Sequence, residues 1–74
     1  MPIVLAPLFK RLSVTRIIAD DKLKRHLENI GLSVNSEVEV LSVSGGSIIC
    51  RVKDGRLALD KQMATKIFVT VKED

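Results

Sequence analysis

The sequence contains neither tryptophan nor tyrosine, and phenylalanine occurs only at Phe9 and Phe68. A hydrophobic core must therefore be aliphatic, drawn from the valine, isoleucine and leucine that dominate its 46% of hydrophobic residues. The scarcity of aromatics also argues against a nucleic-acid partner. Proteins that bind single strands stack the bases on several aromatic side chains, and only Phe68 is expected to lie on a strand face.

Cysteine is almost absent as well, and no long hydrophobic run is present. The single Cys50 excludes an intramolecular disulfide and is typical of a reducing compartment. The longest apolar stretch, residues 3–9, contains Pro7 and is far shorter than the roughly 20 residues of a membrane-spanning helix. It also differs from a signal peptide, because Lys10 and Arg11 follow it instead of preceding it. We expect a cytoplasmic protein with no direct membrane insertion.

Seventy-four residues predict one small domain, with residues 1–12 as an apolar lead-in. A chain of this size buries only about 60% of its unfolded surface and has little room for a deep active site. The Gly45-Gly46 pair lacks the lysine and the following helix of a phosphate-binding loop. No set of nucleophile, base and orienting group can be assembled, so we expect no enzyme, no catalytic residue and no cofactor.

The net charge of +3 is unevenly distributed. Residues 1–26 carry six Lys or Arg against two acids, whereas residues 27–74 carry six against seven. A solvated helix face with flexible ends is one explanation of the basic excess. The other is an electrostatic patch for an acidic partner or an anionic surface. The basic residues concerned are Lys10, Arg11, Arg16, Lys22, Lys24 and Arg25.

A short amphipathic helix is predicted from Asp20-Asp21 to about Ile30. Leu23, Leu27 and Ile30 recur at i, i+4 and i+7, which places them on one stripe. Either aspartate can cap the first backbone N–H groups. Gly31 can end the helix in the left-handed conformation, with Leu32 folding back on the last turn. Asn35 lies where a tight turn before the next strand favours positive φ.

The remaining sequence indicates five strands. The first spans 13–19, and the others lie around 37–43, 48–53, 56–59 and 67–71. Leu41 and Val43 reverse the alternation that Glu37–Val40 begins, which predicts a β-bulge. Residues 44–47 and Asp54-Gly55 are predicted hairpin turns. Asp60 can cap a single helical turn over 61–65.

Five short strands joined by tight turns close most economically into an SH3-like barrel. The lead-in would then pack across one end of the barrel or form a short helical turn after Pro7. The expected core comprises Leu23, Leu27, Ile30, Val38, Val40, Ile48, Val52, Leu57, Leu59, Ile67 and Val69.

The helix–strand joint resembles a known family. Arg25-His26-Leu27-Glu28-Asn29-Ile30-Gly31-Leu32 is similar to the rL-x-x-(L/I)GL motif of the FeoA family. The same pattern continues in order through 37–41, the Gly45-Gly46 turn, 55–59 and 63–69, so the resemblance covers about residues 12–71. Two glycines usual in the family are replaced, one by Leu12 and one by Asn35.

The resemblance implies an SH3-like, cytosolic accessory protein of bacterial ferrous iron uptake with no catalytic residues of its own. Its implied partner is the membrane transporter FeoB, whose cytosolic part is a GTPase. Transition-metal binding is implied only by the general description of the family, and no residue of this sequence is assigned to it. Alternatives are a relative of the C-terminal barrel of DtxR-type metal-dependent repressors, or a general protein-binding module. Only about a dozen residues precede the first strand, too few for a DNA-reading helix-turn-helix. We expect a monomer or a weak homo-oligomer.

His26 and Cys50 are the candidate metal ligands of the sequence, and Cys50 is also a candidate nucleophile. His26 is the only histidine, and together with Cys50 it supplies only two ligands, whereas zinc sites normally recruit three or four side chains. We therefore expect no metal site and a histidine at the boundary of the helix's apolar stripe. Cys50 alternates with Ile48 and Val52 and is expected in the core.

For partner binding, the sequence suggests the basic helix face at Lys24 and Arg25 together with Leu32 at the joint. Ile49 and Phe68, on outward phases of their strands, form a second candidate patch. The alternative for the second patch is that the lead-in covers it.

Overall fold

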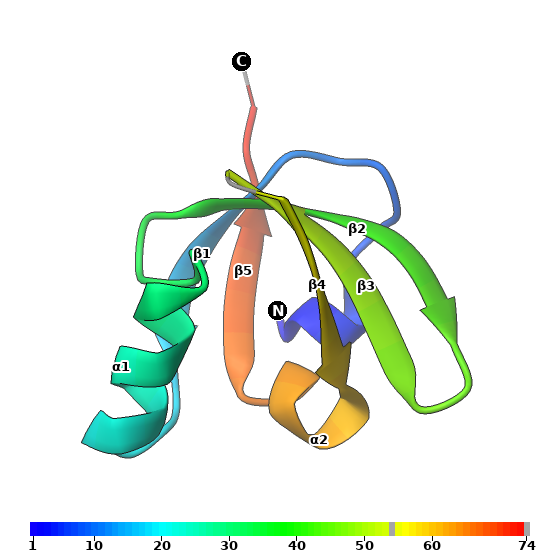
Figure 1. Cartoon of the computed structure of the whole chain (residues 1–74). Helices are drawn as coiled ribbons and strands as arrows, with labels where there is room; N and C mark the ends of the chain where they lie inside the picture. The colour runs from blue at the N-terminus through cyan, green and yellow to red at the C-terminus, as the bar shows by residue number, and fades with distance from the viewer. Residues whose placement is uncertain (54, 74) are drawn as a thin grey trace.

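The computed structural model describes residues 1–53 and 55–73, which form one five-stranded antiparallel sheet in the order β4-β3-β2-β1-β5. In Figure 1 the strands curl around a common interior, with η1 and α2 at its lower end and α1 at its side. This confirms the predicted mainly-β, SH3-like barrel. The strands are β1 (Leu12–Ile17), β2 (Glu37–Ser44), β3 (Ser47–Val52), β4 (Gly55–Asp60) and β5 (Ile67–Val71), and the helices are η1 (Ile3–Leu5), α1 (Asp21–Asn29) and α2 (Lys61–Ala64).

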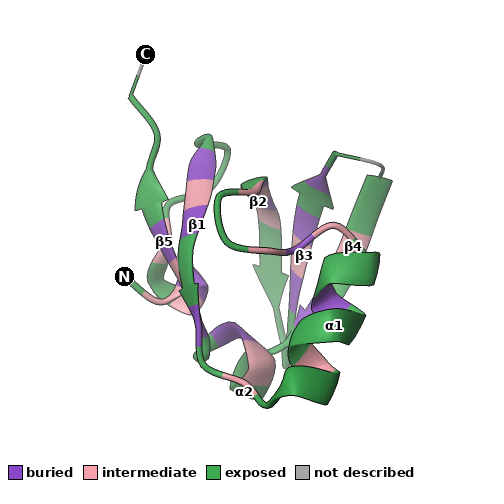
Figure 2. Ribbon diagram, turned by 90° about the vertical axis from the view of Figure 1, so that its left-hand side faces the viewer, coloured by how far each residue is buried: buried purple, intermediate pink, exposed green. Residues whose placement is uncertain are grey.

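The core is aliphatic, as the lack of aromatics requires. Buried residues lie on alternate positions of the strands and on the inner faces of α1 and α2 (Figure 2). Eight expected core residues are buried, and Leu23 and Leu57 are half-buried. Cys50 is buried, as its alternation with Ile48 and Val52 predicted. The core also includes residues that were not expected there: Ile3, Leu12, Val14, Ile17, Leu32 and Ala64.

The assignment of Ile30 to the core was wrong. Its side chain is 37% exposed. Ile30 is the C-cap of α1, with φ −100° and ψ 8°, so its backbone has already left the helical conformation. The stripe predicted from helical spacing therefore stops one turn earlier, at Leu27.

Both ends of α1 follow the predicted chemistry. The Asp20 carboxylate accepts a 2.8 Å hydrogen bond from the Leu23 N–H, which caps the first turn. Gly31 (φ +97°) and Asn35 (φ +77°) both adopt the left-handed region. None of the helices in the described part of the chain is long and apolar enough to cross a membrane.

The lead-in packs against the barrel, which was one of the two arrangements predicted for it. Its Ile3 is only 1% exposed, and the Val69 N–H donates a 2.7 Å hydrogen bond to the Met1 carbonyl oxygen. The helical turn lies before Pro7, not after it. Beyond Pro7 the backbone finds partners on β2 instead, because Leu8 bridges Val40 and the Phe9 N–H donates to the Val40 carbonyl oxygen.

The predicted bulge and turns are present on the other strands. The β2–β3 register shifts between Val40 and Ser42, where the alternation reverses. In the following turn Gly45 has φ +59°, and Gly46 does not require positive φ. Asp54 of the other predicted turn lies outside the described residues, and the neighbouring Gly55 has φ +148°. The Asp60 carboxylate caps α2 by accepting a 2.7 Å hydrogen bond from the Met63 N–H.

Candidate protein-binding surfaces

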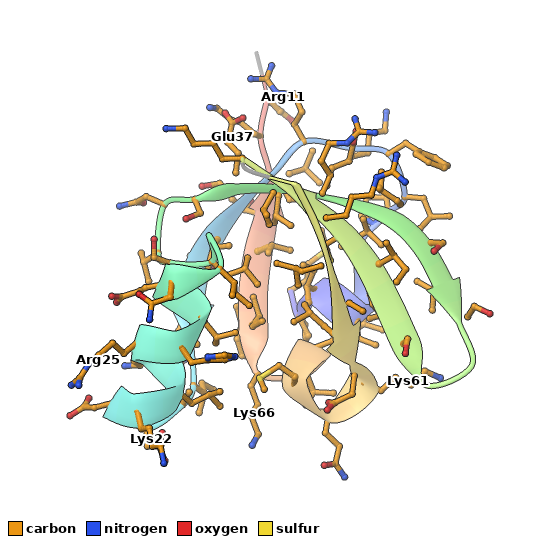
Figure 3. All side chains as sticks on the ribbon, in the orientation of Figure 1. Arg11, Lys22, Arg25, Glu37, Lys61 and Lys66 are labelled. Atoms are coloured by element: carbon orange, nitrogen blue, oxygen red, sulfur yellow. The ribbon has the colours of Figure 1, made fainter. Side chains whose placement is uncertain are left out.

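The outer face of α1 is basic and accessible. Lys24 and Arg25 are exposed, and Figure 3 shows Lys22 and Arg25 pointing away from the barrel. Their placement follows from the helix period: Leu23 and Leu27, four residues apart, face the barrel, so Arg25 lies on the opposite side of the helix and Lys24 on its flank. These two predicted partner-binding residues are therefore free to meet another molecule.

Leu32, the third residue predicted for this surface, is fully buried and cannot contact a partner. Gly31 turns the chain back at the helix end, so that Leu32 enters the core beside Leu27. Ile30 (37% exposed) and Val34 (52% exposed) are the apolar residues that face solvent at this joint. Sequence reasoning missed both, because helical spacing assigned Ile30 to the core and nothing singled out Val34.

Two hollows lie on either side of the connection between α1 and β2. The larger, of about 620 Å³, has Val38 and Val52 among its lining residues, together with three cations and two carboxylates. The smaller, of about 200 Å³, lies between the end of α1 and the start of β4 and is lined in part by Ile30, Leu57 and Arg56. Val52 lines both hollows, so they adjoin each other at the joint.

Ion pairs organise the charges of the larger hollow. The Glu37 carboxylate pairs with Lys72 and, at 3.3 Å, with Arg11. The hydrogen bond and the charge of Lys72, followed by the charge of Arg11, lower the pKa of Glu37. The Glu39 carboxylate lies 3.3 Å from the Arg51 guanidinium. With Lys53 also lining the hollow, positive charge is in excess there.

The second predicted patch is only half-exposed. Phe68 is half-buried: Pro2 bridges it on β5, and the Arg16 guanidinium lies 5.8 Å from the centre of its ring. Ile49 is half-buried between Ser42 and Ala58 on the neighbouring strands. The lead-in therefore takes up part of the surface around Phe68, as the alternative interpretation expected.

The two candidate metal ligands do not come together in a cluster. Cys50 is completely buried, and its burial raises the pKa of the thiol to about 11. His26 is exposed on α1. Across residues 1–53 and 55–73, no group of three or more His, Cys, Asp or Glu side chains is arranged to hold a metal ion.

Comparison with known proteins assigns the fold to a family. The FeoA domain matches residues 1–71. The chain belongs to the FeoA family. Two residues at which it departs from the usual FeoA glycines fit the structure: Leu12 is buried in β1, paired with Val38 and Val71, and Asn35 keeps the left-handed turn.

Solved structures of FeoA proteins share this fold. The FeoA protein from Chlorobium tepidum is 23% identical, with a TM-score of 0.86, over 96% of this chain and 70% of that one. An iron uptake regulatory protein (FeoA) is 26% identical, with a TM-score of 0.81, over 93% and 92% of the two chains. A manganese-dependent transcriptional repressor is 25% identical, with a TM-score of 0.84, over 97% of this chain but 36% of its own. No curated protein matches the chain.

Proposed function

We propose that this FeoA-family protein acts in the cytoplasm by binding the cytosolic GTPase region of a FeoB-type transporter, thereby supporting Fe(II) uptake. The family supports the transport role, and the basic, indented joint between α1 and β2 is the observation that carries the docking proposal. The protein supplies binding and no catalytic residue.

The docking surface combines charge with apolar contact. Lys24 and Arg25 on α1 attract an acidic partner surface and speed the encounter. Ile30 and Val34 then provide the apolar contact that slows dissociation, in place of the buried Leu32. Because so small a domain offers a limited area, the affinity is expected to be modest and sensitive to salt.

The test compares Arg25→Glu with Lys66→Glu. Both residues are exposed, but Lys66 lies at the lower end of the barrel, away from the joint (Figure 3). Calorimetric titration against the purified cytosolic region of the transporter should show weaker binding for Arg25→Glu and unchanged binding for Lys66→Glu, with both variants folded. Iron uptake in cells should fall with Arg25→Glu alone. If folded Arg25→Glu binds and supports uptake like the original protein, the docking face lies elsewhere, and the Ile49 and Phe68 side becomes the next candidate.

The likeness to a manganese-dependent repressor supports a second candidate, a regulatory barrel that binds a DNA-binding domain. The same titration distinguishes the two functions. A repressor-type barrel would bind its DNA-binding partner and leave the transporter's cytosolic region unbound.

A further inference from the structure

The connection between η1 and β1 exposes two large apolar side chains. Phe9 is 65% exposed and Leu8 44%. Neither residue lines either hollow at the joint. In Figure 1 this connection forms a wide bow at the upper right of the molecule, on the other side from α1. We name Leu8 and Phe9 the apolar tip.

The backbone holds the apolar tip in place against its local preference. Phe9 has φ +60°, a left-handed conformation that is rare for a bulky side chain. The bridge between Leu8 and Val40 and the 2.9 Å hydrogen bond from the Phe9 N–H to the Val40 carbonyl oxygen maintain this geometry. A strained residue that presents its ring to solvent indicates a functional surface.

The charge around the apolar tip is positive. Residues 1–19 and 41–53 contain no Asp or Glu. Lys10 and Arg11 directly follow Phe9, and both are exposed. The two carboxylates of β2 nearest in sequence to Val40 are already paired, Glu39 with Arg51 and Glu37 with Arg11 and Lys72.

We propose that the apolar tip and Lys10 bind the headgroup region of an anionic lipid bilayer. The Leu8 side chain and the phenylalanine ring enter the interface, where a fluid surface accommodates a projecting apolar loop without a matching pocket. Lys10 then meets the lipid phosphates. The contact is peripheral and needs no spanning helix. It goes beyond the proposed function, because it requires no transporter.

The experiment uses the whole chain and vesicles that contain no other protein. Co-sedimentation is measured with equimolar phosphatidylglycerol and phosphatidylcholine, and with phosphatidylcholine alone. We expect binding to the anionic vesicles that weakens at high salt. Phe9→Asn should lower the partition coefficient about tenfold, and Lys10→Gln about fivefold. Val34→Ser and Lys66→Gln, which alter exposed residues outside the tip, should leave it unchanged.

Phe9→Asn also separates binding from folding. Asparagine tolerates positive φ better than phenylalanine, so this variant should melt at or above the melting temperature of the original protein. Its binding to the anionic vesicles should nevertheless be weaker. The proposal is overturned if the original protein does not sediment with anionic vesicles, or if Val34→Ser weakens binding as much as Phe9→Asn. It is equally overturned if lipid-free protein self-associates through Phe9, which would make a second copy the occupant of the tip.

Discussion

The Leu32 N–H donates a 2.8 Å hydrogen bond to the Leu27 carbonyl oxygen, across the left-handed Gly31. The Gly31 N–H donates in the same way to Glu28, at 3.1 Å. Together these bonds form a Schellman motif, in which two residues beyond the helix end satisfy its last carbonyl groups. Both leucines are buried, so the end of α1 and the barrel core are joined at one point.

Leu27→Ala should lower the free energy of unfolding by about 2–5 kcal/mol, because Leu27 is 1% exposed and its removal leaves a cavity. That loss is a large share of the roughly 5–15 kcal/mol that stabilises a typical domain. Urea denaturation followed by circular dichroism measures it. Ile30→Ala is the control, with an expected loss below about 1 kcal/mol because Ile30 faces solvent. Equal losses for the two variants would show that helical spacing, and not the structure, identifies the core.

Gly31→Ala should destabilise the protein by about 1–2 kcal/mol, the cost of a left-handed conformation for an L-residue. A Cβ at Gly31 would lie 3.4 Å from a Val52 methyl group, an ordinary contact, so the cost comes from the backbone. Gly46→Ala is the matched control, because Gly46 does not have a positive φ and a Cβ there would meet open space. Thermal melts should place Gly46→Ala within about 0.5 kcal/mol of the original. A neutral Gly31→Ala would contradict the role of the helix end.

Glu37 should contribute stability that depends on pH. Lys72 and Arg11 hold its pKa below the ordinary value of 4.5 in the folded protein. The contribution is therefore complete above the ordinary pKa and is lost as the pH falls through the folded pKa. Urea midpoints from neutral to acid pH should fall less steeply for Glu37→Gln than for the original protein. Because the site is open to solvent, high salt should reduce the difference. Identical pH profiles at low salt would exclude this ion-pair network as a source of stability.

Cys50 should be unreactive in the folded protein. It is fully buried, and its raised pKa, about 11, leaves almost no thiolate at neutral pH. Labelling with a disulfide reagent at mildly alkaline pH should be slower than in urea by about two orders of magnitude or more, since it requires opening of the barrel. Leu27→Ala should accelerate it by lowering the cost of that opening. Rapid labelling of the stable original protein would place Cys50 at the surface.

Local chemistry made several elements predictable. Asp20 and Asp60 cap helices because a short carboxylate accepts a hydrogen bond from the N–H three residues on. The reversed alternation at Leu41 and Val43 marked the bulge, since a strand with period two changes face only through an extra residue. The FeoA resemblance, carried by the motif around Leu27 and Gly31, also depended on sequence alone and is confirmed.

The candidate surfaces were less predictable. Lys24 and Arg25 are exposed, as the helix period required. Leu32 was predicted at the surface and is buried, whereas Ile30 was predicted in the core and is exposed. The direction of the chain after Gly31 decides which of the two enters the core. Spacing along one helix contains no information about that direction.

The sequence by itself determined the short-range features of this protein: caps, left-handed turn residues, strand alternation and the aliphatic nature of the core. Each depends on residues within a few positions of one another. Only the tertiary structure decided that the lead-in packs against β5, that Leu32 is buried, and that Phe9 is held outward against β2. The position of the lead-in and that of Phe9 arise from backbone partners 31 to 68 residues apart, as between Phe9 and Val40 and between Met1 and Val69. Such pairings form only when the whole barrel closes, because the entropy of bringing distant segments together is recovered by many contacts at once.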